Sequence, residues 1–336
     1  MSPIAPALAA LGAEIKHLTA QFGEPVDVAA MGVTDRAGHL RLGRPGLCAP
    51  NGACRMVRTR DGWIAVNLAR AEDIELVPAW LGCGPVANAW GVLEKAARQR
   101  GTEALLAGAI LLGLPVAKVG EVTSDTLRMP TIAMGAPLVA RFSGRLRVVD
   151  LSALWAGPLC GAILARAGAQ VSKYESVIRP DPTATATPEF FDRLNGEKSL
   201  FALDFSASTD QARLRKVIAS ADILITSARP RAFSAIGLSP EQIFADNPNL
   251  TWIAITGYGW TGEAAARVAF GDDAAAAGGL VGWTKAGAPR FLGDALADPL
   301  TGLAAAAEAL RAVQAGGGVL VDMAMAGCAA RAAAIQ

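Results

Sequence analysis

The stretch LRVVDLSALWAGPLCG, residues 146–161, decides which fold the sequence predicts. LRVVDL is typical of a buried strand, and the residues from Pro158 onward are typical of a helix. Gly157 and Pro158 form the turn between them, and a strand–turn–helix unit of this kind is the building block of a parallel α/β sheet. The first backbone N–H groups of the helix suit a phosphate, but a plain tight turn explains the spacing equally well.

The same alternation of strand and helix continues along the chain. Further strands are predicted at 170–175, 199–205, 221–227, 250–256 and 318–325, with helices at 158–168, 208–219, 231–236, 239–245, 272–282 and 299–314. Such units are joined by right-handed crossovers, so the sheet is mostly parallel and ligands bind beyond the carboxyl ends of its strands. The expected class is α/β, with a Rossmann-like large domain over residues 145–336.

The first part of the chain has a different texture. A helix is predicted at 7–22 in an N-terminal helical segment, 1–42. Residues 43–128 predict a small α+β domain, in which 50–68 form a hairpin that turns at Arg60-Asp61-Gly62 and helices follow at 72–81 and 86–112. Residues 129–144, rich in turn formers, predict a linker.

Composition narrows the classes of function. The chain of 336 residues carries 31 basic and 30 acidic residues, so no charge excess points to nucleic acid. Five cysteines form no CxxC pair, no apolar run of 18 residues occurs, and no signal peptide is evident, so we expect a cytoplasmic protein without a metal or a membrane partner. The low charged fraction (18%) and the high apolar fraction (52%) suit a buried parallel sheet and a large subunit contact.

Two local motifs have competing interpretations. GYGWTG (257–262) matches GxGxxG, but it follows a late strand, so it is weak evidence for a dinucleotide site. In FLGDALADPLTGLAAAAEAL (291–310), Asp298 precedes Pro299 and an Ala/Leu run, which is the pattern of a helix N-cap. On this stretch alone, a structural cap is the simpler interpretation of Asp298.

Several segments together resemble the class III CoA-transferase family, which includes formyl-CoA and carnitine CoA-transferases and α-methylacyl-CoA racemase. They are VVDLSALWAGPLCGAILARAGAQVSKYE (148–175), NGEKSLFALDF (195–205), ADILITSARPRAFSAIGLSPEQI (221–243), NPNLTWIAITGYGWTG (247–262), ADPLTGLAAAAEAL (297–310) and GGGVLVDMAM (316–325). Residues 49–68 and 113–122 resemble the family's small domain, which in the family follows the large one. The resemblance therefore implies a permuted order, and it implies a homodimer.

The resemblance also implies a site. The family's catalytic D-x-x-x-G falls on Asp298–Gly302, which makes Asp298 the nucleophile that attacks a CoA thioester and then carries CoA as an aspartyl-CoA thioester. An ordinary carboxylate is ionised at pH 7 and needs no general base. The residues carried over as CoA contacts are Ala153, Leu154, Trp155, Ala156, Arg179, Leu203, Phe205, Ser227, Ala228 and Arg229. Coenzyme A, an acyl donor and a carboxylic acid are the implied substrates.

Two alternatives remain open. A racemase would need a second base, and no histidine follows His39, so Asp272 would have to act. The replaced CoA contacts, with Ser176 where the family has an arginine, also allow a CoA-binding subunit without catalysis.

Overall fold

The computed structural model describes residues 4–123, 129–138 and 144–335. Its larger sheet has seven strands among these residues, in the order β4-β12-β9-β8-β5-β6-β7. Six of them are parallel, and β4 pairs antiparallel with β12 at one edge. The strands are β4 (Thr131–Ala133), β5 (Arg147–Leu151), β6 (Gln170–Ser176), β7 (Ser199–Leu203), β8 (Ile223–Thr226), β9 (Thr251–Thr256) and β12 (Val319–Ala324). The predicted α/β class with a mostly parallel sheet is confirmed.

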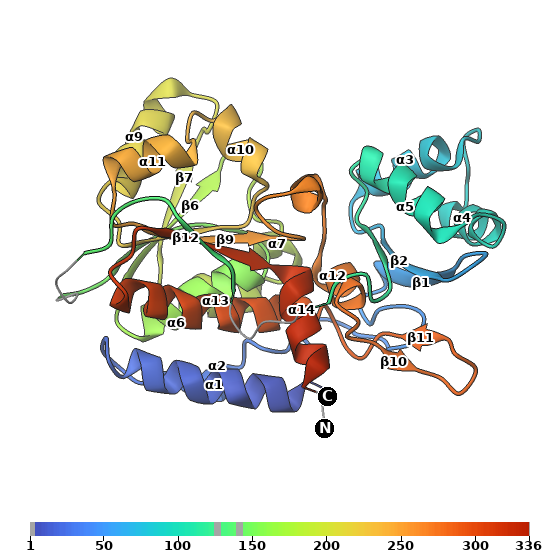
Figure 1. Cartoon of the computed structure of the whole chain (residues 1–336), viewed down its shortest axis with the longest axis horizontal. Coiled ribbons are helices and arrows are strands. Elements are labelled where there is room, and N and C mark those ends of the chain that lie inside the picture. Colours follow the sequence, from blue (N-terminus) through green and yellow to red (C-terminus); the bar gives the residue numbers. More distant parts are fainter. Residues whose placement is uncertain (1–3, 124–128, 139–143, 336) are drawn as a thin grey trace.

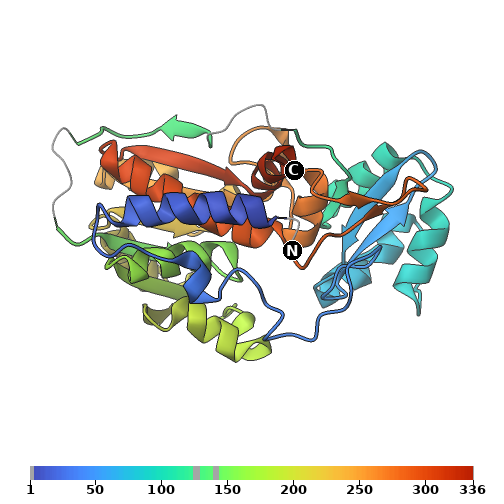
Figure 2. The ribbon, with the colours of Figure 1, turned by 90° about the horizontal axis from the view of Figure 1, so that it is seen from below.

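Helices cover both faces of this sheet (Figure 1). Residues that alternate along each strand point to opposite faces, as Val148 and Val149 do, and so build two separate cores. One face carries α1 (Ala5–Thr19), α6 (Ala156–Arg166) and α13 (Ala297–Gln314); the other carries α9 (Ser208–Ile218), α10 (Pro230–Ala235) and α11 (Pro240–Asp246). Figure 2 shows α1 running along α13, so the N-terminal helix extends the first core.

The predicted hairpin is present in a smaller antiparallel sheet, β1-β2-β3. β1 (Cys54–Arg58) and β2 (Trp63–Asn67) turn at residues 59–62, and β3 (Val116–Lys118) pairs with β2. The single helix predicted over 86–112 is wrong. Gly101 takes an extended conformation and splits it into α4 (Ala89–Ala97) and α5 (Thr102–Leu111), which pack with α3 (Ala71–Leu81) on one face of the small sheet.

Some of the remaining elements lie around the junction of the two sheets, and others lie against the large sheet and its helices. They are α2 (Val28–Met31), α7 (Thr183–Ala186), α8 (Pro188–Asn195), the 3-10 turn η1 (Glu263–Ala266), α12 (Gly271–Ala277), β10 (Gly282–Trp283), β11 (Pro289–Arg290) and α14 (Met325–Ala334). The residues after β3 hydrogen-bond to the end of α12, through Gly120 N–H to Ala276 O and Val122 N–H to Ala277 O, both 2.9 Å. A fourth apolar cluster buries Ala65 and Ala117 of the small sheet against Ala276 and Ala277. The small sheet is therefore fixed to α12.

The predicted domain boundaries stay predictions. The predicted linker, 129–144, contains β4, which adds a strand to the large sheet, and residues 139–143 of it lie outside the described residues. Residues 124–128, the end of the predicted small domain, also lie outside them.

Candidate functional site

Asp298 lies in the first turn of α13 rather than at its N-cap. The N-cap position is taken by Leu296, and no side-chain cap bond is present there. The predicted cap is wrong because the helix begins before Asp298, and the Asp298 N–H already donates to Ala295 O at 2.9 Å. Its carboxylate is thus not consumed in closing its own helix.

Three helix N-termini surround this carboxylate. Asp298 comes from α13, its carboxylate lies against Gly271 at the start of α12, and the backbone N–H of Ala156 at the start of α6 is close enough to lower its pKa. A Cβ on residue 271 would overlap Asp298 Oδ2, so only glycine fits there. Helix N-termini stabilise negative charge, and the arrangement therefore favours an anion or a developing oxyanion at Asp298.

The turns that enter α6 and α13 are both strained. Among the described residues, Leu154 (φ 70°) and Ala295 (φ 46°) are the non-glycine residues with left-handed backbone. Such backbone costs on the order of 1 kcal/mol or more per residue, and it clusters at functional sites. Ala295 accepts the Asp298 N–H through its own carbonyl oxygen, and Leu154 lies two positions before Ala156, whose N–H lowers the pKa of Asp298.

Two further carboxylates stand beside Asp298 and are fully engaged. Arg36 donates to Asp294 through two nitrogens, at 2.8 and 2.9 Å. Asn51 donates to both Asp272 (2.6 Å) and Asp294 (2.8 Å). The other Asp272 oxygen accepts from Ala295 N–H at 2.7 Å.

A fourth carboxylate, Asp273, has a structural role. Asn67 of β2 and the N–H of Phe270 both donate to its Oδ1 at 3.0 Å, so it caps α12 and links that helix to the small sheet. Burial raises its pKa to about 7.

The ionisation of Asp298 departs from that of an ordinary carboxylate. Burial raises its pKa to about 7, with Arg36 opposing the rise and the charges of Asp272 and Asp294 adding to it. Burial likewise raises the pKa of Asp272 to about 6. The expectation that Asp298 is fully ionised at neutral pH is therefore wrong.

The exposed fraction of its side chain distinguishes Asp298 from the three other aspartates. The exposed fractions of Asp272, Asp273 and Asp294 are 2%, 0% and 9%, whereas Asp298 is only half-buried. Among the described residues of this cluster, Asp298 is the one aspartate whose carboxylate is reached by solvent and accepts no hydrogen bond from another side chain.

The structure brings the predicted CoA contacts to one sheet edge. They follow the carboxyl ends of four neighbouring strands: β5 (Ala153–Ala156), β6 (Arg179), β7 (Leu203, Phe205) and β8 (Ser227, Ala228, Arg229). Ser227 Oγ accepts from Ala153 N–H at 3.0 Å, so two of these loops touch. Arg179 and Ser227 are exposed, whereas Trp155, Ala156 and Leu203 are buried, so the side chains of these three are closed to a ligand.

Trp155 is a core residue. Its side chain is 3% exposed, its Nε1–H donates to Val33 O at 2.9 Å, and its ring meets Phe190 edge to face. The guanidinium of Arg36 lies 4.8 Å from the ring centroid. A ligand contact through the Trp155 ring is therefore not available.

Sequence reasoning missed Arg36 and Asn51. They lie 258 and 243 positions from Asp294, on segments without any motif. Asn51 stood in a hairpin assigned only to the small domain, and Arg36 in a segment assigned only a helix.

The GYGWTG loop is held by its own neighbours. Gly259 N–H donates to Thr256 Oγ1 (2.9 Å) and Trp260 N–H to Asp322 Oδ2 (2.8 Å). Both donors are used inside the protein, so these two N–H groups are not open to a dinucleotide phosphate.

Two other kinds of site are absent from the described residues. Over residues 4–123, 129–138 and 144–335, no group of three or more His, Cys, Asp or Glu side chains is placed to hold a metal ion. In the same residues, no helix has both the length and the apolar character needed to cross a bilayer.

Comparison with known proteins gives concordant matches. The family model described as CoA-transferase family III matches residues 144–336, more than half of the chain. A succinyl-CoA–D-citramalate CoA-transferase of Chloroflexus aurantiacus is 30% identical over 191 residues, 53% of this chain and 48% of that protein. A succinate–glutarate CoA-transferase of Agrobacterium fabrum is 29% identical over 199 residues, 54% of this chain and 50% of that protein.

The chain is also similar to a solved structure. The crystal structure of a CAIB/BAIF family protein from Brucella suis superposes with a TM-score of 0.52 at 31% identity, over 57% of this chain and 55% of that one. The chain spans about half the length of the curated relatives that it matches.

Proposed function

The chain belongs to CoA-transferase family III, and from that membership we propose that it moves CoA between an acyl-CoA thioester and a carboxylic acid, with Asp298 as the nucleophile. The observation that carries the proposal is the half-buried carboxylate of Asp298 among neighbours that are engaged elsewhere. A nucleophile must be reachable and must keep a lone pair free, and Asp298 meets both needs.

The proposed reaction runs through two kinds of covalent intermediate, mixed anhydrides and an aspartyl-CoA thioester. The Asp298 carboxylate attacks the thioester carbonyl and expels CoA thiolate, which leaves a mixed anhydride. The thiolate then attacks the Asp298 carbonyl of that anhydride, which releases the donor acid and leaves an aspartyl-CoA thioester. The acceptor carboxylate and the same thiolate repeat these steps in reverse order, so that a new acyl-CoA leaves and Asp298 is regenerated.

The surroundings of Asp298 suit these steps. The N–H of Ala156 and the N-termini of α6, α12 and α13 favour negative charge on the oxygens where it develops. A pKa near 7 makes the ionised carboxylate a stronger base than an ordinary aspartate, while about half of it remains ionised at pH 7. Arg36 limits the repulsion that an incoming carboxylate would meet from Asp294.

The proposed CoA site is the sheet edge beside Asp298. The loops after β5, β6, β7 and β8 lie next to one another there, which is where ligands of parallel sheets bind. Exposed Arg179 and half-buried Arg229 are the cations we assign to phosphate. The predicted homodimer and cytoplasmic location stay predictions, and sedimentation velocity at micromolar concentration tests the first.

The decisive experiment traps the intermediate. The protein is incubated with a panel of acyl-CoA thioesters and hydroxylamine, and its peptides are mapped by mass spectrometry. We expect a hydroxamate on Asp298, no hydroxamate in Asp298→Asn, and a retained Asp298 hydroxamate in Asp294→Asn. Acyl-CoA binding without any hydroxamate would instead support a CoA-binding subunit without catalysis.

The racemase alternative meets an obstacle at Asp272. Both of its oxygens already accept hydrogen bonds, from Asn51 and from Ala295 N–H. The Asp272 side chain is also only 2% exposed, so the α-proton of a bound substrate has little access to its carboxylate. We therefore propose that a 2-methylacyl-CoA does not exchange its α-proton for deuterium in heavy water, and exchange that is lost in Asp272→Asn would overturn this.

A further inference from the structure

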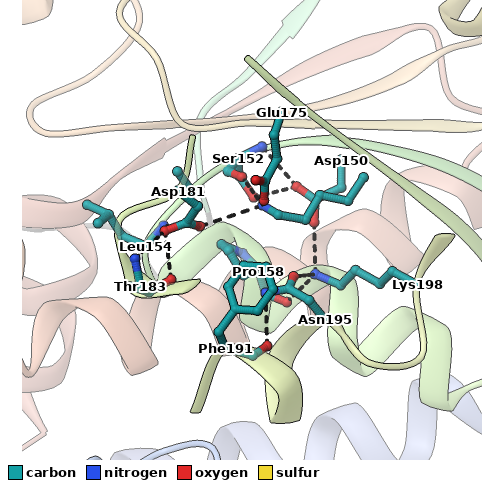
Figure 3. Close-up of polar contacts among 12 residues, drawn as sticks. Asp150, Ser152, Leu154, Pro158, Glu175, Asp181, Thr183, Phe191, Asn195 and Lys198 are labelled. Atoms are coloured by element: carbon teal, nitrogen blue, oxygen red, sulfur yellow. Dashed lines mark hydrogen bonds and ion pairs between the residues drawn. The ribbon is translucent and has the colours of Figure 1, made fainter. Parts of the chain in front are cut away.

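A buried network of charges lies beneath the loop that leads from β5 into α6 (Figure 3). Its charged members include Asp150, Lys173, Asp181 and Lys198, whose exposed fractions are 0%, 0%, 3% and 8%. Burying charges costs several kcal/mol per ion unless each is paired and hydrogen-bonded, so a network of this kind needs a reason. Its hydrogen bonds go largely to the loop 152–155 and to the first turn of α6.

Lys198 ties the end of β5 to α6. Its ammonium group donates to Asp150 Oδ2 (2.9 Å), Pro158 O (2.8 Å) and Asn195 Oδ1 (2.9 Å). An ammonium group has three N–H donors, and all three are used. Burial would raise the pKa of Asp150, but the charges of Lys198 and Lys173 hold it below its ordinary value, so Asp150 stays ionised.

Lys173 and Asp181 hold the loop from its other side. The Lys173 ammonium donates to Ser152 O at 2.5 Å and lies 3.7 Å from Asp181 Oδ2. The same Asp181 oxygen accepts from Leu154 N–H at 3.0 Å. Asp150 Oδ1 accepts from the N–H of Ser152 at 2.9 Å and also from its hydroxyl.

The loop is therefore fixed at each of three successive residues, Ser152 to Leu154, by side chains from other positions. This fixation explains how Leu154 stays in the left-handed region, where a branched side chain is strained. Two residues later comes Ala156, whose backbone packs against the start of α13: its carbonyl oxygen lies 2.6 Å from the place that a Cβ on Gly302 would take, and its N–H lowers the pKa of Asp298. The direction of that N–H depends on the path of the loop before it.

We propose that Lys173, Asp181 and Lys198 are positioning residues, which hold the strained 152–155 loop so that the Ala156 N–H reaches the Asp298 carboxylate. They touch neither the carboxylate nor a substrate, and they act through the backbone. That this positioning serves catalysis rests on the proposed function. Its effect on the ionisation of Asp298, however, can be measured without any turnover.

The test variant is Asp181→Asn. Asp181 Oδ1 accepts from the N–H and the hydroxyl of Thr183, and Oδ2 faces Leu154 N–H and Lys173. All of these groups are donors, so an amide NH₂ fits on neither side. The matched control is Thr183→Val, which removes a hydrogen bond to Asp181 but leaves the contacts to Leu154 and Lys173 in place.

The readout is the protonation of Asp298. A carbodiimide with an amine labels protonated carboxyl groups, and peptide mass spectrometry gives the fraction of Asp298 labelled as a function of pH. Loss of a donor to the charged form raises a carboxyl pKa. We expect the midpoint of labelling to rise by about one pH unit in Asp181→Asn and to stay unchanged in Thr183→Val. In the double variant Asp181→Asn with Leu154→Gly, glycine removes the backbone strain, so the midpoint should fall back towards that of the wild type.

Each outcome of these measurements leads to a different conclusion. A folded Asp181→Asn protein with the wild-type midpoint overturns the inference. If that variant does not fold, the same measurement on Asp181→Glu decides, because the longer side chain keeps the charge but moves the carboxylate out of its hydrogen bond to Leu154 N–H: a higher midpoint supports the inference and an unchanged one overturns it. A raised midpoint in a protein that never forms the hydroxamate supports the positioning role and rejects the transferase proposal.

Discussion

At the scale of single residues, the raised pKa of Asp298 links its chemistry to protein stability. In the unfolded chain its pKa is 3.8, and in the folded protein it is about 7. The folded state therefore holds the proton more tightly, and stability from this group is lost as the pH rises from about 4 to about 7. Above pH 7 the folded protein must carry an unfavourable buried charge.

Asp298→Asn removes that charge and should stabilise the protein at pH 8. Because the carboxyl is partly exposed, we expect a gain of only about 1 kcal/mol, or about 2 °C in Tm. At pH 4 the gain should disappear, since the wild-type carboxyl is then protonated in the folded state. Calorimetry at the two pH values measures the difference, and a lower Tm for the variant at pH 8 would contradict the assigned ionisation.

Arg36 sets the pH range in which Asp298 is ionised. Its charge lowers the pKa of Asp298, so Arg36→Met should raise that pKa and move the acid limb of kcat/KM for acyl-CoA to higher pH. The loss of activity should accordingly be larger at pH 6.5 than at pH 8.5. Arg41→Met, an exposed arginine of the same segment, is the control and should keep the wild-type profile. Equal losses at both pH values would assign Arg36 a purely structural role.

Sequence reasoning predicted part of this site and could not predict the rest. Asp298 was identified because D-x-x-x-G is local in the chain. Arg36 and Asn51 were not, because a partly buried arginine or asparagine has no local signal: each is recognisable only by its partner more than 200 positions away. The pKa of Asp298 was mispredicted for the same reason, since burial and neighbouring charges are tertiary properties.

At the scale of elements, the alternation of strand and helix was sufficient for the large sheet. The predicted strands that build its parallel part are all present, because buried parallel strands form short apolar runs between helices. Helix ends were less predictable. The run 318–325 continues directly into α14, an Ala-rich helix that was not predicted although alanine favours helices.

The start of α12 gives a prediction for an element. Gly271 lies where a Cβ would overlap the Asp298 carboxylate and would come within 2.7 Å of Ala295 O. Gly271→Ala should therefore displace either the carboxylate or α12, with a loss of transferase activity of at least about a hundredfold, as expected for about 3 kcal/mol of lost transition-state stabilisation. Initial rates with a saturating acyl-CoA measure it.

The matched control for Gly271→Ala is Gly12→Ala in α1, where nothing lies within 4 Å of the added Cβ. Alanine is favoured over glycine inside a helix, so this variant should keep its activity and be slightly stabilised. If Gly271→Ala also remained fully active, Asp298 would not occupy the position that the structure gives it during turnover.

At the scale of the whole molecule, segments from all parts of the chain meet at Asp298. The N-terminal segment contributes Arg36, the hairpin region contributes Asn51, and β2 contributes Asn67 to the cap of α12. Since Asn67 of the small sheet holds α12, which carries Asp272 and Asp273, the site depends on how firmly the small sheet is joined to α12.

That junction contains a partly buried ion pair. Arg267 donates to Glu121 at 2.6 and 3.1 Å, the two side chains are 10% and 13% exposed, and the guanidinium lies 3.6 Å from the ring centroid of Tyr258. Breaking such a pair from one side leaves a charge with little solvent and costs about 3 kcal/mol or more. Glu121→Gln should therefore lower the Tm clearly and should reduce hydrogen-exchange protection in β1–β3 more than in the large sheet.

A second glutamate nearby supplies the control for this last prediction. Glu103 pairs with Lys118 of β3 at 2.7 Å, but the two side chains are 73% and 46% exposed. Exposed pairs contribute less than about 1 kcal/mol, so Glu103→Gln should leave both the Tm and the exchange pattern almost unchanged. Because Asn51 and Asn67 together hold three carboxylates near Asp298, Glu121→Gln should also reduce turnover, and Glu103→Gln should not. Equal stability and activity in the two variants would mean that the small sheet is held in place by the apolar contacts to α12 alone.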